Sequence, residues 1–156
     1  MLKKSAGILL YRFQDEKLEV LLVHPGGPFW AKKDLGIWSI PKGEFEEDEE
    51  PLAAAKREFR EELGVAVSGN FTAMTPVKQK NYKIVYAFAL NVDLDVSNIK
   101  SNTFAMEWPP KSGKRQEFPE VDKAEWFEFE MAKLKINEAQ GEILEELMRK
   151  INDGKM

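Results

Sequence analysis

The sequence predicts an α/β protein with a mixed sheet and helices on its faces. Short apolar runs typical of strands occur along the chain, and two segments carry an apolar stripe at helical spacing. These strands and helices do not alternate regularly, which favours a mixed sheet over a parallel one. The length of 156 residues fits one domain. We therefore expect residues 1–156 to fold as a single unit.

The first part of the chain is predicted to form a hairpin. Residues 5–11 are short and apolar, as in a buried strand, and residues 18–23 return as a second apolar strand. The polar residues 13–17 supply the turn between them. Pro and Gly then predict a loop over residues 24–36, and a short strand is expected over residues 37–40.

A helix is predicted from Pro51 to Leu63. Proline suits the first turn of a helix, where its missing N–H group costs nothing. Gly64 is typical of the residue that follows a helix end. The apolar residues of the segment recur at intervals of three, four and four residues and define one face: Leu52, Ala55, Phe59 and Leu63.

The second half predicts another hairpin, a late strand and a terminal helix. The hairpin strands are expected over residues 71–80 and 82–94, and residues 95–120 are expected to be irregular. Residues 125–129 alternate like a strand. Asn137 is expected to cap a helix that ends at Gly154. Its apolar face comprises Leu144, Leu147, Met148 and Ile151.

Composition excludes several functional classes. There is no Cys, so disulfides, thiolate metal sites and cysteine nucleophiles are excluded. The 23 basic and 27 acidic residues give a net charge of −4, which argues against broad binding to DNA or RNA. The apolar run before Arg12 is too short for a signal peptide or a membrane span. We expect a cytoplasmic protein with no DNA or membrane partner.

Three carboxylates share one face of the predicted helix 51–63: Glu58, Glu61 and Glu62. Their mutual repulsion, together with the acidic run over residues 44–50, makes sense if a divalent cation lies among them. Oxygen ligands without Cys or clustered His indicate Mg²⁺ or Mn²⁺. The alternative is a solvated helix face in which Arg57 simply pairs with Glu61.

The residues around this helix resemble the Nudix box, whose pattern is Gly-x5-Glu-x7-Arg-Glu-apolar-x-Glu-Glu-x-Gly-apolar. Every fixed position is filled, and chance would fill seven such identities with a probability on the order of 10⁻⁸ to 10⁻⁹ per start position. The strands before the box and the terminal helix also resemble a Nudix domain. The identities that carry the likeness are Gly43, Glu49, Arg57, Glu58, Glu61, Glu62 and Gly64.

The resemblance implies an α/β/α sandwich with a mixed central sheet, the box as a loop–helix–loop on one side, and a C-terminal helix. It also implies hydrolysis of a nucleoside diphosphate linked to another group. The metal ligands would be Glu58, Glu61 and Glu62. Glu49 would lie close to the metal, and Arg57 would orient these acids. Gly43 would allow a tight loop whose backbone carbonyl reaches a metal.

A further acid is expected outside the box. Glu120 precedes Trp126 by six residues, which resembles the position of an additional acid in related enzymes. We expect Glu120 to be a metal ligand or general base, with a plain surface glutamate as the alternative. Glu117 is the second choice, because the pattern alone does not fix the register of this loop.

The substrate-binding candidates are Lys42, Tyr82 and Lys83. Residues 38–43 resemble the stretch that enters the box in Nudix hydrolases of dinucleoside polyphosphates, so Lys42 is expected to contact phosphate. Tyr82 could stack on a base and Lys83 could reach the polyphosphate. The alternatives are an ordinary loop lysine and an exposed hairpin end. Trp30 is either a base platform or tucked against the domain, and His24 is expected to be structural within a loop.

The leading hypothesis is an Mg²⁺-dependent pyrophosphohydrolase. The preferred substrate is a dinucleoside polyphosphate such as diadenosine tetraphosphate, followed by nucleoside triphosphates and then by capped or triphosphorylated RNA ends. The alternative is a Nudix-fold module that binds a nucleotide without turning it over, although such modules usually lose box carboxylates that are present here. The oligomeric state stays open.

Overall fold

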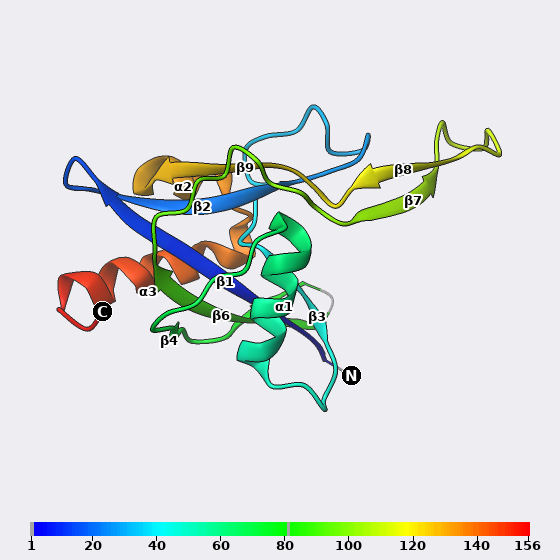
Figure 1. The fold of residues 1–156 in the computed structure, drawn as a ribbon. Helices are drawn as coiled ribbons and strands as arrows, with labels where there is room; N and C mark the ends of the chain where they lie inside the picture. Colours follow the sequence, from blue (N-terminus) through cyan, green and yellow to red (C-terminus); the bar gives the residue numbers. More distant parts are fainter. Residues whose placement is uncertain (1, 81) are drawn as a thin grey trace.

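The computed structural model describes residues 2–80 and 82–156. A seven-stranded sheet forms its centre (Figure 1), in the order β4-β6-β1-β2-β9, with β3 paired to β1 and β5 paired to β6. Among the strands of the described residues, β1 and β6 pair in parallel and every other pair in this sheet is antiparallel. The predicted mixed sheet is therefore confirmed. Its strands are β1 (Lys3–Gln14), β2 (Lys17–Pro25), β3 (Lys42–Phe45), β4 (Thr72–Ala73), β5 (Val77–Gln79), β6 (Lys83–Asn91) and β9 (Val121–Glu128).

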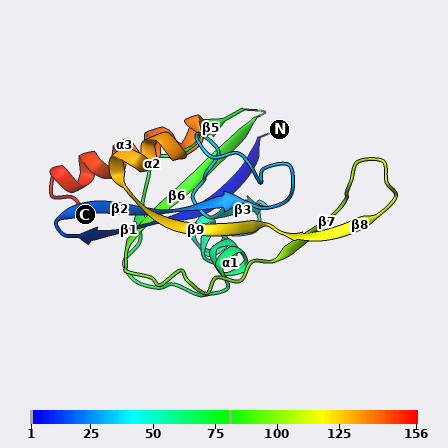
Figure 2. The ribbon, with the colours of Figure 1, turned by 90° about the horizontal axis from the view of Figure 1, so that it is seen from above.

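Helices cover both faces of this sheet. Figure 2 shows α1 on one side of the strands and both α2 and α3 on the other. This arrangement matches the expected α/β/α sandwich with a C-terminal helix. The helices are α1 (Pro51–Leu63), α2 (Phe129–Lys135), a short 3₁₀ turn η1 (Glu138–Gln140) and α3 (Gly141–Asn152).

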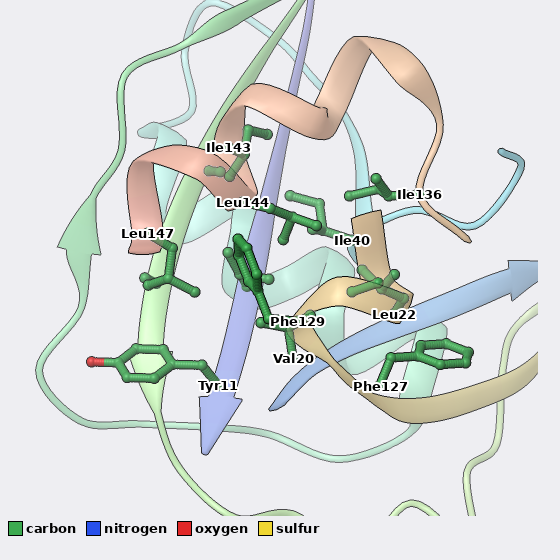
Figure 3. Packing of buried hydrophobic residues seen from close by; sticks show 14 of the residues in the cluster. Tyr11, Val20, Leu22, Ile40, Phe127, Phe129, Ile136, Ile143, Leu144 and Leu147 are labelled. Carbon is green, nitrogen blue, oxygen red and sulfur yellow. The ribbon is translucent and has the colours of Figure 1, made fainter. Parts of the chain in front are cut away.

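Strand β1 separates two apolar cores. Because successive strand residues point to opposite faces, Leu9 and Tyr11 pack on the α3 side (Figure 3), whereas Ile8 and Leu10 pack on the α1 side. Burial on both faces explains the continuous apolar run in the sequence. The predicted hairpin with β2 is confirmed, and its two-residue turn over 15–16 has positive φ at both positions.

Helix α1 forms as the sequence predicts. Pro51 occupies its first turn, and the apolar stripe buries Phe59 and Leu63 completely against the sheet. Gly64 has φ +77°, a left-handed conformation that glycine adopts without strain. Its N–H donates to the carbonyl of Arg60 at 2.7 Å. This firm placement of the helix fixes the positions of the box carboxylates.

Several expected elements differ from the structure. Residues 37–40 make only isolated bridges, and the strand lies instead at β3, paired with β1 through Gly43 and Ala6. Residues 71–80 are divided into β4 and β5. Residues 129–135 form a helix that the sequence analysis did not anticipate. The expected irregular region contains a second sheet, the hairpin of β7 (Thr103–Glu107) and β8 (Arg115–Pro119), which projects from the body of the molecule (Figure 1).

His24 lies at the end of β2 and is buried, rather than in a loop as expected. Its Nδ1 is 2.8 Å from an Asp122 carboxylate oxygen, and its Nε2 is 2.7 Å from the backbone carbonyl of Lys33. The structural role expected for His24 is supported, because these contacts tie the loop over residues 26–36 to the sheet. Asn137 is a cap as expected, since its side chain accepts from the N–H of Gln140 at 3.2 Å, but it caps the turn η1 and not the terminal helix, which begins at Gly141. Within the described ranges, no helix combines the length and apolar character needed to cross a membrane.

Candidate active site

Helix α1 presents its carboxylates beside β3. The apolar stripe faces the sheet, so Glu58, Glu61 and Glu62 lie along the flank of the helix, half-buried. Glu58 packs directly on the backbone of Gly43. A Cβ atom added at Gly43 would lie 2.0 Å from the carboxyl carbon of Glu58, which is impossibly close. Glycine therefore lets the Glu58 carboxylate lie against this backbone, and any side chain here would force that carboxylate to move.

Arg57 links three of the box acids. Its Nε and Nη2 each donate to Glu49 at 2.9 Å, and its Nη1 donates to Glu58 at 3.1 Å and to Glu61 at 3.4 Å. The hydrogen bonds to Glu49, followed by the neighbouring negative charges, raise the pKa of Arg57. In return, Arg57 lowers the pKa of Glu49. The orienting role expected for Arg57 is consistent with this geometry.

Glu62 is the most deeply placed of the box acids. Its Oε1 accepts the backbone N–H of Lys42 at 3.0 Å. The pKa of Glu62 is raised to about 8, mainly by burial and also by the charges of Glu58 and Glu120, against the opposing effect of that hydrogen bond. Burial also raises the pKa of Glu58 and of Glu120, with a further contribution from Glu61 in both cases. Several carboxyl groups are thus held close together here, and the neighbouring positive charges do not fully compensate them.

Glu120 comes from a distant part of the chain and reaches the same place. It follows β8, where its backbone N–H donates to the carbonyl of Asn102 at 2.8 Å and its carbonyl accepts from Gly26 at 2.9 Å. Glu62, Lys42 and Glu120 together line a cavity of about 130 Å³. Glu117, the second choice, is exposed on β8 and is not among the residues that line this cavity.

The three candidates for substrate binding, Lys42, Lys83 and Tyr82, lie in different surroundings. Lys42 lines the cavity, and burial lowers its pKa against the attraction of Glu62. The charge of Lys83 also lowers the pKa of Lys42, so the two lysines lie near each other. Tyr82 is 76% exposed in the turn before β6 and is not among the residues that line the described cavities near the carboxylates.

The donor set fits a hard divalent cation. Carboxylate oxygens are the ligands that Mg²⁺ and Mn²⁺ prefer, and the raised pKa values of Glu58, Glu62 and Glu120 indicate charge that a cation would relieve. As the side chains stand, no three acids of the described residues enclose a cation position. Arg57 contacts only one carboxylate oxygen of Glu58 and one of Glu61, so the other oxygen of each acid stays available to a cation.

A second cavity of about 340 Å³ adjoins the first. Pro25, Ile37, Ser39 and Lys42 line both cavities. The second is also lined by residues that come from three separate segments: Trp30, Gln79 and Asn137. Trp30 was expected either as a base platform or as packed against the domain, and Gln79 had no expected role, because no local pattern indicates that both residues line one cavity.

Comparison with known proteins agrees with this architecture. The NUDIX domain family model matches residues 1–147. An RNA pyrophosphohydrolase of Bartonella henselae is 24% identical over 147 residues, covering 82% of this chain and 77% of the relative.

Two solved structures share the fold. The C. elegans Ap4A hydrolase in a binary complex has a TM-score of 0.65 and 23% identity, covering 97% of this chain and 99% of the other. The NUDIX domain of Shewanella oneidensis NrtR with ADP ribose has a TM-score of 0.67 and 15% identity, covering 97% and 89%.

The fold, the box helix and the family match together define the class: the chain belongs to the Nudix family. The resemblance found in the box residues is thereby confirmed.

Proposed function

We propose that the protein hydrolyses a phosphoanhydride bond in a nucleoside diphosphate linked to a second group, with Mg²⁺ or Mn²⁺ as cofactor. Its assignment as a hydrolase of pyrophosphate bonds follows from membership of the Nudix family and from its similarity to a pyrophosphohydrolase. One observation carries the proposal: Glu62 of α1 and the distant Glu120 line the same cavity, together with Lys42. Acid and base groups therefore meet where a polyphosphate could enter.

The box residues have distinct proposed roles. Glu58, Glu61 and Glu62 would hold the metal, with Glu49 close by. When bound, Mg²⁺ supplies positive charge that neutralises phosphate oxygens and lowers the pKa of a water molecule. Arg57 orients the acids through its hydrogen bonds to Glu49, Glu58 and Glu61.

Residues outside the helix would handle the substrate and the proton. Lys42 lines the cavity and would attract a phosphate oxygen. Lys83, whose charge is felt at Lys42, would contact a more distant phosphate. Glu120 would accept the proton of the attacking water, since burial raises its pKa and so makes its carboxylate a stronger proton acceptor. Tyr82 would pack on a base only if the substrate extends along the outside of β6.

A dinucleoside polyphosphate such as diadenosine tetraphosphate is the preferred substrate. Two lysines near the carboxylates, Lys42 and Lys83, suit a chain of several phosphates. The run over residues 38–43 resembles that of hydrolases acting on such substrates. The similar C. elegans protein is an Ap4A hydrolase, which supports the same choice. Nucleoside triphosphates are the next most favoured substrates.

We propose a cytoplasmic location, because the cysteine-free sequence carries no disulfide framework of the kind found in secreted domains.

A triphosphorylated RNA end is the second candidate substrate. The Bartonella henselae relative is an RNA pyrophosphohydrolase. The tip of the projecting β7–β8 hairpin carries three exposed basic residues that could contact the RNA backbone: Lys111, Lys114 and Arg115.

A panel of substrates tests these proposals. Diadenosine tetraphosphate, the common nucleoside triphosphates and a 5′-triphosphorylated RNA oligomer are incubated with the protein and Mg²⁺, and products are separated by chromatography. We expect fastest turnover of diadenosine tetraphosphate and none with a chelator. Equal inertness towards all substrates, combined with measurable nucleotide binding, would favour the non-catalytic Nudix module instead.

A further inference from the structure

His24 lies between the loop over residues 26–36 and the segment that carries Glu120. It is the only histidine of the chain and is 2% exposed. Its Nε2 is 2.7 Å from the carbonyl oxygen of Lys33, and its Nδ1 is 2.8 Å from a carboxylate oxygen of Asp122. Because a carbonyl oxygen only accepts, Nε2 carries a hydrogen, and Nδ1 shares another with the Asp122 carboxylate. Each ring nitrogen is therefore engaged with a different segment of the chain.

Asp122 is the extra residue of a β-bulge between β2 and β9. Lys123 lies opposite His24, whereas Val121 lies opposite the next residue of β2, Pro25. The pairing of the two strands thus passes over Asp122. Bulges of this kind redirect side chains and are frequent beside active sites. Here the bulge lies two residues after the acid that we propose as the general base.

The two backbones beside this bulge are in close contact. Gly26 donates its N–H to the carbonyl of Glu120 at 2.9 Å. A Cβ atom added at Gly26 would lie 1.9 Å from the carbonyl oxygen of Pro119, so glycine permits the close approach of the two segments. The contact between His24 and Asp122 joins the same two segments through their side chains. A displacement of the His24 ring would therefore move the backbone that bears Glu120.

We propose that His24 and Asp122 are positioning residues, which hold Glu120 in the cavity where it accepts the proton of the attacking water. This inference rests on the proposed function, because it takes Glu120 to be the general base. The backbone of Glu120 is fixed by its hydrogen bonds to Asn102 and Gly26, so the place of its carboxylate follows that of the main chain. A displacement of about 1 Å in a reacting group can cost on the order of 100-fold in rate.

Two amide variants separate the two contacts of the His24 ring. The side-chain amide of asparagine can occupy the place of Nδ1, and that of glutamine the place of Nε2. His24→Asn therefore keeps the contact with Asp122, whereas His24→Gln keeps only the contact with the Lys33 carbonyl. Kinetics are measured with the substrate that the wild type hydrolyses fastest. We expect His24→Gln to lower kcat by about 10- to 100-fold while KM changes by less than about twofold, and His24→Asn to recover most of that loss.

A double variant distinguishes positioning from a merely structural role. Without its general base the enzyme has nothing left for His24 to position, so His24→Gln combined with Glu120→Gln should be no slower than Glu120→Gln alone. Asp34→Ala controls for loosening of the loop, because it removes a different anchor of that loop, the hydrogen bond from Trp38 Nε1 at 2.8 Å. Asp34→Ala should keep the wild-type kcat.

Asp122→Ala removes the same contact from the other side. Its side chain is partly exposed, so this variant replaces His24→Gln in every comparison if melting shows that His24→Gln is unfolded. If wild-type protein hydrolyses no nucleotide, the proposed function fails and the inference fails with it. If the wild type is active but His24→Asn is as slow as His24→Gln, or the two losses multiply in the double variant, the positioning role alone is overturned. A wild-type kcat in Asp122→Ala would overturn it as well.

Discussion

Arg57 donates two parallel hydrogen bonds to Glu49, from Nε to Oε2 and from Nη2 to Oε1, each 2.9 Å long. This pairing uses the planar fork of the guanidinium, which a lysine ammonium does not reproduce. It fastens the loop before α1 to the helix that carries the acids. The remaining Nη1 contacts Glu58 and Glu61, so one side chain sets the orientation of three carboxylates.

Arg57→Lys should therefore lower kcat by about 10- to 100-fold, the usual cost of removing a group that orients metal ligands. The melting temperature should change little, because the pair is partly exposed and such pairs contribute little to stability. Steady-state kinetics with diadenosine tetraphosphate gives the measurement. Arg60→Lys makes the same change at an exposed position of α1 and should be silent. Equal rates for both variants would remove the orienting role.

Replacement of the proposed ligands should abolish most activity without unfolding the protein. Glu61→Gln or Glu62→Gln should cut turnover by orders of magnitude, because each removes a charged oxygen from the metal site. Circular dichroism should show an unchanged fold. The concentration of Mg²⁺ needed for half-maximal rate should rise in any residual activity. Near-normal rates in both variants would contradict the metal assignment.

The metal-free protein should lose stability as pH rises. The pKa of Glu62 in the folded state is about 8, above its ordinary 4.5, so folding favours the protonated carboxyl. This contribution to the free energy of unfolding is fully present below pH 4.5 and is lost as pH rises through 8. Thermal melts with a chelator should therefore show a steeper decline for the wild type than for Glu62→Gln. Added Mg²⁺ should restore stability at the upper end, whereas parallel curves for the two proteins would contradict this reasoning.

Gly43→Ala should impair catalysis by displacing Glu58. The new methyl group would overlap the Glu58 carboxylate, which must then move or rotate away from the other acids. We expect a loss of at least roughly tenfold in kcat together with weaker Mg²⁺ dependence. Gly141→Ala is the control, because a Cβ there meets nothing within 4 Å at the start of α3. A fully active Gly43→Ala protein would show that Glu58 is not needed in this position.

Glu120→Gln and Glu117→Gln separate the two acids near the end of β8. Loss of a general base lowers the rate by about 10²- to 10⁴-fold, and we expect Glu120→Gln to fall in this range. Both glutamates are exposed, but Glu117 does not line the cavity that Glu120 lines, so its variant should match the wild type. A pH–rate profile adds a second criterion, since the acidic limb should change only in Glu120→Gln. If the Glu120→Gln enzyme keeps the wild-type rate, Glu120 is a plain surface glutamate with no part in catalysis.

Local signals in the sequence predicted the elements that depend on local chemistry. Pro51, the apolar stripe and Gly64 were enough to define α1 to the residue, because helix ends are set by proline, glycine and periodicity. The capping role of Asn137 was likewise predictable, although the residue caps η1 and not α3. The box acids followed from spacing along one helix face. Each of these features lies within one short segment.

Features that depend on distant partners were not predictable. Strand β3 contains Gly43 and the acidic Glu44, and it forms because β1 offers an unpaired edge. The β7–β8 hairpin is polar and interrupted by two prolines, so its segment read as irregular. The cavity that Gln79 and Trp30 both line depends on how an edge strand and a long loop are placed relative to each other. No pattern within either segment encodes that arrangement.

A crystal structure of the protein soaked with MgCl₂ and a non-hydrolysable diadenosine tetraphosphate analogue tests the central claim most directly. The account predicts Mg²⁺ coordinated by carboxylate oxygens of Glu58, Glu61 and Glu62, with the phosphate chain beside Lys42. A nucleotide bound elsewhere, with those oxygens still engaged by Arg57 and the backbone of Lys42 and no cation among them, would contradict it.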